Sequence, residues 1–264
     1  MSGFEFTFVI CAYKESPYIE EAIISAEKQT IPVKRLIATS TPSDYLARIA
    51  QRHGIGYVVN PAKNGIAADW NFALKQIKTP FGCIMHQDDV YFPRYAENMV
   101  RIMTRHPNVS IAFSDYCDLL DDGRYHPHRM YLWIKRLLLW PFYLKHCHAR
   151  IFWKRSALVF GNAISCPAVS YNMEKLGSLE FDPSFSVNLD WAQWLTLAER
   201  EGAFAFIPRV LMAHRIEEHM ETAAAIADNR RFDEDFRIFE KIWGTKFARF
   251  IMRFYSKAYS ANQN

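Results

Sequence analysis

The chain has 264 residues, half of them hydrophobic, and a formal net charge of +4. This composition excludes an intrinsically disordered protein and supplies enough apolar surface for one large domain or two small ones. The modest positive charge gives no argument for a nucleic-acid-binding protein, and no nucleic-acid partner is expected.

The first 115 residues alternate between strand-like apolar runs and helix-like segments, which predicts a mostly parallel sheet covered by helices on both faces. The expected strands are residues 6–11, 35–39, 57–60, 81–85 and 109–114. The expected helices are residues 17–28, 43–52, 66–77 and 93–105. In the first of these helices, Ser16 is predicted to be the cap and Pro17 suits the first turn.

The second half of the chain is less regular. Residues 129–150 contain no acid and many large apolar side chains. A helix is expected at 190–200 and a short strand at 204–207, before Pro208. Without an internal repeat or a linker, the two halves are predicted to form one compact domain with a C-terminal extension.

Five scattered cysteines form no Cys-x-x-Cys motif: Cys11, Cys83, Cys117, Cys147 and Cys166. The pattern therefore indicates neither a redox motif nor a cysteine-type zinc site, and a reduced cytoplasmic protein is expected. The start of the chain does not read as a signal peptide, and no uncharged apolar run reaches the roughly 18 residues of a spanning helix.

Two adjacent carboxylates follow the apolar run 81–85, in the sequence His86-Gln87-Asp88-Asp89. Ligands of open α/β sheets bind outside the carboxyl ends of the strands. Paired acids at that place suit a divalent cation that holds a phosphate-bearing substrate. The alternative is a pair of turn residues that cap the next element.

Several motifs in a fixed order resemble the family 2 glycosyltransferases over roughly residues 6–222. They are residues 9–15 (VICAYKE), Gln29-Thr30, residues 64–71 (NGIAADWN), 86–89 (HQDD), 189–195 (LDWAQWL), 207–208 (IP) and 211–215 (LMAHR). The resemblance implies a GT-A type, Rossmann-like α/β domain of the nucleotide-diphospho-sugar transferase superfamily, with an inverting mechanism. Residues 1–222 would form that domain, with a nucleotide-sugar-binding half at 1–115 and an acceptor and catalytic half at 116–222. Residues 223–264 would be a helical extension.

The resemblance implies a Mn²⁺ or Mg²⁺ site that neutralises the diphosphate leaving group. Asp89 would ligate the ion, and Asp88 would contact the ribose, or the ion or its water shell. His86 stands where the family usually has the first acid of an Asp-x-Asp triplet. Either His214 or His219 would complete the metal site, with solvated loop histidines as the alternative.

The resemblance also implies a set of residues on the nucleotide sugar: Ala12, Tyr13, Glu15, Thr39, Asn64, Gly65, Asn71, Gln87, Asp88 and Arg215. Tyr13 is expected to stack on the base or to shape its pocket. Thr39 stands where relatives commonly have an acid, so UDP is favoured while GDP and dTDP stay open. Asn71 is equally well explained as a helix residue whose amide is satisfied within the protein.

Asp190 is the catalytic base that the resemblance implies, because an inverting transfer needs a carboxylate to take the proton of the acceptor hydroxyl. Trp191 and Trp194 are expected to exclude water and to raise its pKa. A plain helix N-cap is the alternative role for Asp190, and the two are compatible.

Residues 129–150 and 246–259 combine aromatic and basic side chains without acids, a pattern that suits peripheral contact with an anionic membrane. Core packing or a homodimer interface is the alternative. Membrane contact would fit a lipid-linked acceptor in bacterial surface polysaccharide synthesis, at the inner face of the cell membrane. The cluster His126, His128, His146, Cys147 and His148 lacks structural-zinc spacing.

The competing function is a catalytically silent nucleotide-sugar-binding or scaffold protein of the same fold, which the departures at His86 and Thr39 motivate. A nucleotidyltransferase or a dehydrogenase is disfavoured because residues 6–15 contain no glycine.

Overall fold

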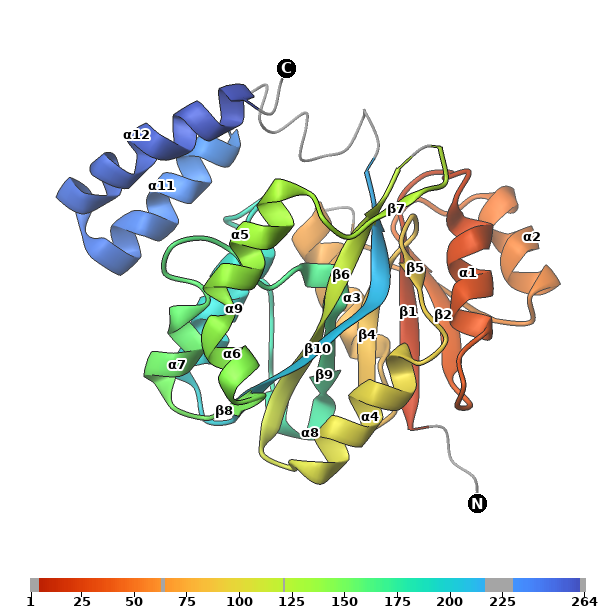
Figure 1. Cartoon of the computed structure of the whole chain (residues 1–264). Helices are drawn as coiled ribbons and strands as arrows, with labels where there is room; N and C mark the ends of the chain where they lie inside the picture. Colours follow the sequence, from red (N-terminus) through yellow and green to blue (C-terminus); the bar gives the residue numbers. More distant parts are fainter. Residues whose placement is uncertain (1–4, 63–64, 121, 217–229, 262–264) are drawn as a thin grey trace.

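The structure is a computed structural model that describes residues 5–62, 65–120, 122–216 and 230–261, with side chains through residue 253. Its strands form one mixed sheet in the order β3-β2-β1-β4-β9-β6-β10-β5, with β7 beside β6 and β8 beside β10 (Figure 1). The strands are β1 Phe6–Ala12, β2 Lys34–Thr39, β3 Gly56–Val59, β4 Phe81–His86, β5 Val90–Tyr91, β6 Val109–Leu119, β7 Tyr125–His126, β8 Cys147–His148, β9 Val169–Asn172 and β10 Ala203–Arg215.

Helices cover both faces of this sheet. They are α1 Ile19–Glu27, α2 Asp44–Arg52, α3 Ile66–Gln76, α4 Tyr95–Arg105, α5 Met130–Leu138, α6 Trp140–Leu144, α7 Ile151–Ser156, α8 Met173–Leu176, α9 Leu189–Glu199, α11 Arg230–Trp243 and α12 Thr245–Ala261, with a 3₁₀ turn η1 at Cys166–Ala168. No helix in the described part of the chain is both long and apolar enough to span a bilayer.

Strand β1 shows why the first half folds as predicted. Its side chains alternate between two cores: Phe8 and Ile10 pack with α1, α2 and α4, while Val9 packs with α3 and α9 on the opposite face. Because both faces are buried, the strand reads as a continuous apolar run. Strands β3, β2, β1 and β4 pair in parallel, which confirms the predicted sheet.

Two features of the sheet were not predicted. The four-residue strand β9 inserts antiparallel between β4 and β6, and β10 runs thirteen residues from Ala203 to Arg215. The expected strand at 204–207 is only its first part, because the chain passes Pro208 by a register shift between Ile207 and Val210. Proline lacks a backbone N–H, so it fits only where the ladder is interrupted.

The start of α1 also differs from the prediction. The helix begins at Ile19, its N-cap is Tyr18, and the Ser16 hydroxyl accepts the Tyr18 N–H at 3.2 Å instead of capping the helix. The second helix, α2, begins one residue later than predicted, at Asp44, because Ser43 is its N-cap and accepts the Leu46 N–H at 3.3 Å.

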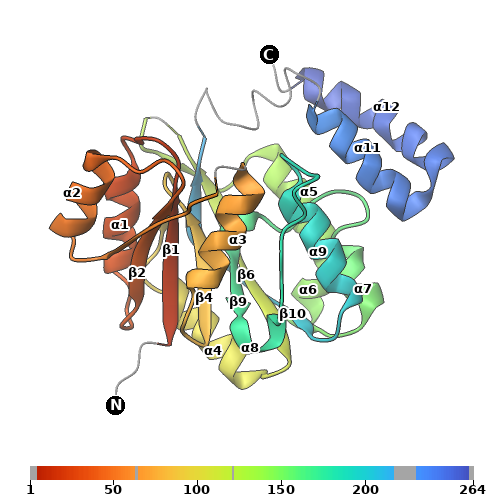
Figure 2. The same ribbon diagram turned by 180° about the vertical axis from the view of Figure 1, so that it is seen from behind.

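The C-terminal residues form a helical hairpin that turns at Gly244, whose φ of 77° is in the left-handed region. Ile238 and Phe239 of α11 and Met252 of α12 belong to the same core as Trp191 of α9. The hairpin lies against the upper end of α9 in both views (Figures 1 and 2). Residues 230–261 are therefore helical, and they share a hydrophobic core with the preceding part of the chain.

Candidate functional site

The candidate site lies along one edge of the sheet, at the top of Figure 1, where β1, β2, β4, β6 and β10 all end. Register brings the ends together: Ala12 pairs with Thr39, and Cys11 pairs with His86. A segment rises from α8 to the same edge, and α9 begins there with Asp190 in its first turn (Figure 2). Residues from both halves of the chain thus meet at the carboxyl edge of the sheet, as expected for an α/β ligand site.

His86, Asp88 and Asp89 form a cluster whose ligand atoms lie within 4.8 Å of one another. Asp89 is completely buried; its Oδ1 accepts the Arg215 N–H at 3.0 Å, whereas its Oδ2 has no hydrogen-bond partner among the described residues. Within the part of the chain that the structure describes, the buried Nε2 of His86 also has no partner, and the His86 Nδ1 lies 3.4 Å from Asp89 Oδ2. Buried polar atoms are rarely left unsatisfied, so a carboxylate oxygen and an imidazole nitrogen left over here fit a cation.

The electrostatics of this cluster agree with that interpretation. Burial, reinforced by the charge of Asp88, raises the pKa of Asp89. Burial lowers the pKa of His86, whose ring stacks on Trp70 at 5.4 Å between centroids. Without a cation the site therefore disfavours the charged carboxylate, and a bound divalent ion reverses that preference because it supplies the opposite charge.

Arg215 is buried beside the acidic cluster and makes several contacts within the protein. Its side chain is 4% exposed, donates from Nε to the Asp88 carbonyl at 3.0 Å and from Nη2 to the Glu21 carboxylate, and lies over the Tyr18 ring. All these contacts are made within the protein. The sequence predicts Arg215 on the nucleotide sugar, and that stays a prediction; in the structure its guanidinium binds the loop that carries Asp88 and Asp89.

Of the two histidines proposed as additional metal ligands, only His214 can be described. It lies outside the His86, Asp88 and Asp89 cluster, edge-on to Tyr116. Burial, with smaller effects from the charges of His86 and Lys135, lowers its pKa to about 3, so the ring is neutral at pH 7. His219 lies outside the described residues, as does Asn64.

Gln87 fixes the loop that follows β1. Its side-chain amide accepts the Tyr13 N–H at 3.1 Å and donates to the Tyr13 carbonyl at 3.1 Å. The Tyr13 ring is 57% exposed, and Lys14 lies over it at 5.2 Å with a φ of 58°. Glu15 is exposed beside it. Gln87 therefore presents an open aromatic face by holding the backbone beneath it.

Thr39 is buried at the end of β2, and its Oγ1 accepts the Thr41 N–H at 3.0 Å. The acid in this part of the site is Asp69 of α3, which the sequence prediction missed. Asp69 accepts hydrogen bonds from Ser40 (2.8 Å) and from Asn60 (2.8 Å). It therefore ties the ends of β2 and β3 to α3. Its place in the quoted 64–71 motif was the only signal in the sequence.

Gly65 is the N-cap of α3 and has a φ of 84°, a conformation that side chains rarely adopt. Asn71, one turn further on, donates to the Phe181 carbonyl at 3.0 Å and accepts the Phe181 N–H at 2.6 Å. Its amide thus joins α3 to the segment that leads to α9. This is the satisfied helix residue considered as the alternative for Asn71.

Both oxygens of Asp190 are hydrogen-bonded. Oδ1 accepts the Trp191 N–H at 2.8 Å, and Oδ2 accepts from Asn162 Nδ2 at 2.7 Å. Burial raises the pKa of Asp190, and these two bonds partly offset the effect. The N-cap of α9 is Asn188, so the N-cap role considered for Asp190 is wrong.

The helix that carries Asp190 is capped by a carboxylate from α11. Glu234 accepts the backbone N–H groups of Ser186 (2.6 Å), Val187 (3.0 Å) and Asn188 (2.8 Å). Next to it, Asp235 accepts from Asn188 Nδ2 at 2.7 Å. A carboxylate at a helix N-terminus accepts hydrogen bonds from the unpaired amides and interacts favourably with the positive end of the helix dipole.

The other end of α9 is also held by a charge. Lys154 is fully buried, and its ammonium donates to the carbonyls of Arg200 (2.7 Å) and Gly202 (2.9 Å). Along the helix, the indole N–H of Trp191 donates to Leu158 O at 2.9 Å. Asp190 therefore stands on a helix fixed at both termini and along its length.

The buried thiol of Cys166, in η1, is influenced by the charges of both Asp89 and Asp190. Burial raises the pKa of its thiol, and the charges of both Asp190 and Asp89 add to the shift. Both carboxylates therefore lie within electrostatic reach of one buried side chain, on the same edge of the sheet.

The sequence model described as "Glycosyl transferase family 2" matches residues 7–166. Among solved structures, TarS 1-349 from S. aureus in complex with UDP-GlcNAc has a TM-score of 0.64 at 15% identity over 94% of this chain and 70% of that one. A second TarS 1-349 structure has a TM-score of 0.63 at 14% identity, covering 93% and 72% of the two chains.

The mannosyltransferase PcManGT from Pyrobaculum calidifontis, in complex with GDP-Man and Mn2+, has a TM-score of 0.58 at 15% identity, covering 97% and 75% of the two chains. No curated protein sequence matches this chain. At this level of identity, the structural similarity establishes the fold, which is GT-A.

Proposed function

The chain belongs to glycosyl transferase family 2, and from this premise we propose that it is an inverting, metal-dependent enzyme. It transfers one sugar from a nucleotide-diphosphate sugar, with UDP favoured, to a glycan or a lipid-linked glycan. The observation that carries the proposal is the buried pair of unsatisfied atoms, Asp89 Oδ2 and His86 Nε2, beside Asp88 at the carboxyl edge of the sheet.

Asp89, His86 and Asp88 are the residues that would hold the ion. A divalent cation there would act as a Lewis acid on the departing diphosphate. Carboxylates suit both Mg²⁺ and Mn²⁺, but the imidazole nitrogen is a poor ligand for Mg²⁺, which prefers oxygen. His86 in place of an acid therefore favours Mn²⁺.

The nucleotide would lie between the β1 and β2 ends. The exposed ring of Tyr13, held from below by Gln87, is the stacking surface that supports this position. Thr39 is buried and bonded to Thr41, so Asp69 takes the place of the acid that relatives have at the end of this strand. The similar TarS structure is a complex with UDP-GlcNAc, and the similar PcManGT structure is a complex with GDP-Man. UDP remains our proposal for this chain.

Asp190 would take the proton of the acceptor hydroxyl. The acceptor oxygen attacks the anomeric carbon on the face opposite the nucleotide diphosphate, the bond from that carbon to the diphosphate oxygen breaks, and the proton moves to Asp190. Asn162 and the Trp191 N–H orient the carboxylate, and burial raises its pKa toward the range useful to a general base.

We further propose that the acceptor is presented at the inner face of the bacterial cell membrane, during surface polysaccharide synthesis. Segments 129–150 and 246–259 are the candidates for peripheral contact. The large exposed side chains of the first segment support this, whereas the side chains of 254–259 lie outside the described residues. A homodimer through the same surfaces is the competing arrangement.

A thermal-shift screen against nucleotide sugars, with and without Mn²⁺, tests the proposal. The correct donor stabilises the protein by mass action, and the shift depends on the metal. Absence of a metal-dependent shift with any donor would contradict the proposal. If a donor binds but is neither hydrolysed nor transferred to any acceptor, the chain is instead the catalytically silent nucleotide-sugar-binding or scaffold protein that the His86 and Thr39 departures suggest.

A further inference from the structure

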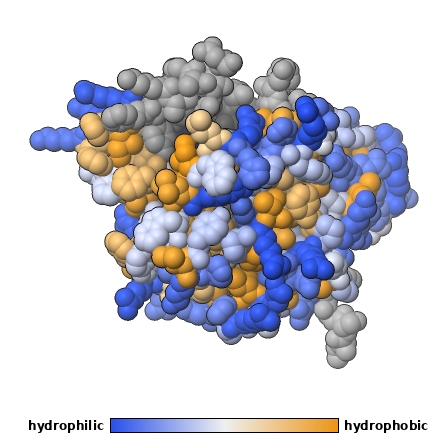
Figure 3. All heavy atoms as spheres, in the orientation of Figure 1, coloured by the Kyte–Doolittle hydropathy of each residue, from blue (hydrophilic) through white to orange (hydrophobic). Residues whose placement is uncertain are grey.

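The side of the molecule formed by α5, α6 and α7 exposes large hydrophobic side chains. Met130, Leu137, Leu144 and Phe152 are between 69% and 82% exposed. Trp133, Ile134, Trp140 and Ile151 are about half exposed on the same three helices. We call these eight residues the α5–α7 face; they lie at the left of Figure 3, where orange and pale side chains gather. Apolar patches of this extent mark contact surfaces in soluble proteins.

The charges around this face have one sign. The sequence contains no acidic residue between Asp122 and Glu174, whereas it contains Arg124, Arg129, Lys135, Arg136, Lys145, Arg150, Lys154 and Arg155. Several of these cations are used internally: Arg136 pairs with Asp115, and Lys154 binds carbonyls. Lys145 and Arg150 are exposed and form no ion pair with any described residue.

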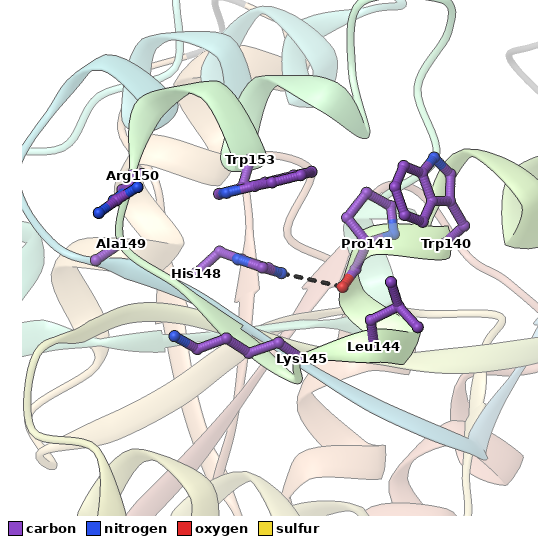
Figure 4. Close-up of a pocket in the computed structure, with 8 residues that line it drawn as sticks. All are labelled: Trp140, Pro141, Leu144, Lys145, His148, Ala149, Arg150 and Trp153. Atoms are coloured by element: carbon purple, nitrogen blue, oxygen red, sulfur yellow. Dashed lines mark hydrogen bonds between the residues drawn. The ribbon is translucent and has the colours of Figure 1, made fainter.

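A pocket of about 490 Å³ opens at the edge of the face (Figure 4). It is lined by Trp140, Pro141, Leu144, Lys145, His148, Ala149, Arg150 and Trp153. The His148 ring, held by a hydrogen bond from Nε2 to Pro141 O at 3.1 Å, lies between the two ends of the pocket. The charged ends of Lys145 and Arg150 are on one side of it, and Trp140 with Leu144 are on the other.

Such a pocket matches an amphiphile with an anionic head. The two unpaired cations suit a phosphate group, while the exposed Trp140 and Leu144 suit acyl chains. Trp140 and Trp153 meet edge to face at 6.2 Å and give this end a rigid aromatic border. Tryptophan beside lysine and arginine is the usual composition of a surface that lies in the interface of an anionic bilayer.

A second copy of the chain fits this face less well. A twofold contact brings the same patch of two subunits together, so Lys145 and Arg150 would meet their own copies. The sequence from 123 to 173 offers no carboxylate to pair with them, and like charges in an interface oppose association.

We propose that the α5–α7 face lies on an anionic phospholipid bilayer, with a lipid phosphate between Lys145 and Arg150 and with Trp140, Leu144 and Phe152 in the acyl region. This extends the membrane contact proposed above to α7 and to a defined headgroup site. It does not depend on the donor or on Asp190, because the pocket lies near the Lys154 end of α9, at the opposite end from Asp190.

Co-sedimentation of the full chain with vesicles of phosphatidylcholine, with and without phosphatidylglycerol, tests the proposal. The protein should bind the anionic vesicles more tightly. The double variant K145Q/R150Q should bind them about 30-fold more weakly, since each basic residue near an anionic surface contributes about fivefold in affinity. L144Q/F152Q should weaken binding to both vesicle types, because acyl contact does not depend on headgroup charge.

The matched control is K28Q/R48Q, which removes two exposed cations, one at the C-cap of α1 and one on α2, at the opposite end of the sheet. It should bind like the unchanged protein. The proposal is overturned if the chain binds neither vesicle type, if K28Q/R48Q weakens binding as much as K145Q/R150Q, or if light scattering shows a dimer that L144Q/F152Q dissociates. Donor-dependent thermal shifts of the same variants report separately on the proposed function.

Discussion

The carboxylates of Asp89 and Asp190 differ in how many of their oxygens accept hydrogen bonds from the described residues. Asp89 is buried with one oxygen bonded to the Arg215 amide and the other unpaired. Asp190 has both oxygens bonded, to Trp191 and Asn162, on a helix fixed at both ends. The first arrangement leaves an oxygen available for the cation that we propose. The second is complete, and it fixes the direction of the carboxylate that we propose as the catalytic base.

The difference gives a general way to separate the roles of buried carboxylates. A buried carboxylate without a partner in the protein is stabilised when it binds a cation. One that the protein pairs with neutral donors keeps its orientation while its pKa stays raised by burial. Asp235 is an intermediate case: one oxygen accepts from Asn188, the other has no partner among the described residues, and burial raises its pKa to about 6.

The largest effect is expected from Asp89→Asn. Transfer should fall about 10⁴-fold, because the Lewis acid on the diphosphate contributes several kcal/mol to the transition state. The stabilisation by Mn²⁺ in thermal unfolding should disappear, whereas the metal-free variant should be at least as stable as the metal-free parent, since an unpaired buried charge is removed. Asp44→Asn, an exposed acid on α2, is the control. A retained Mn²⁺ shift would show that the unpaired oxygen is not a metal ligand.

Asp190→Asn should reduce transfer about 10³-fold, the usual contribution of a general base. Donor binding and the Mn²⁺ shift should both be kept, because the change is on the other side of the site. In the unchanged protein the rate should rise with pH through the raised pKa of Asp190, since the ionised carboxylate is the active form. A pH–rate profile of the variant should lack that rise. Loss of donor affinity instead of rate would assign Asp190 to binding.

Asp235 should make stability depend on pH. Its folded-state pKa of about 6 exceeds the ordinary value of 3.8, so the folded state holds the proton more tightly and stability is greatest below pH 4. The free energy of unfolding should fall by roughly 3 kcal/mol between about pH 4 and pH 6 because of this group. Urea unfolding of Asp235→Asn should show a flatter profile, and Asp233→Asn, an exposed acid of the same helix, should not. Equal profiles for all three proteins would contradict the raised pKa.

Glu234→Gln is expected to have the smallest effect. Loss of a charged cap on three backbone amides should lower the free energy of unfolding by about 1–2 kcal/mol. The value of kcat should fall about tenfold while KM for the donor stays unchanged, because the helix under Asp190 loosens and the metal cluster does not. Glu174→Gln, an exposed acid on α8, is the control. Equal losses in kcat and in donor affinity would show a general loss of folding instead.

The sequence predicted the parts of the site that local pattern determines. The position of Asp88 and Asp89 at the carboxyl edge of the sheet was predictable because they follow a buried apolar strand that pairs in parallel with β1, whereas their roles stay a prediction. Asp190 was found by resemblance alone. The contacts of the Arg215 guanidinium with Glu21 and the Asp88 carbonyl could not be predicted, because they join segments far apart in the sequence.

Contacts between distant segments explain the remaining misses. Strand β9 is only four residues long and is defined by pairing with β4 and β6. The role of Asp69 could be assigned only from the structure, in which Ser40 and Asn60 lie within hydrogen-bond distance of its carboxylate. The Glu234 cap joins residues 46 to 48 positions apart, and no local motif marks such a partner.

The cap on α9 makes the order of synthesis matter. A nascent chain that has reached residue 222 already contains His86, Asp88, Asp89 and Asp190, but it lacks the carboxylate that satisfies the Ser186–Asn188 amides and the Phe239 ring that covers Trp191. Without α11 and α12 these amides would lack their partner and Trp191 would be exposed to solvent, so proteolysis ahead of α11 should destabilise the start of the helix that carries Asp190.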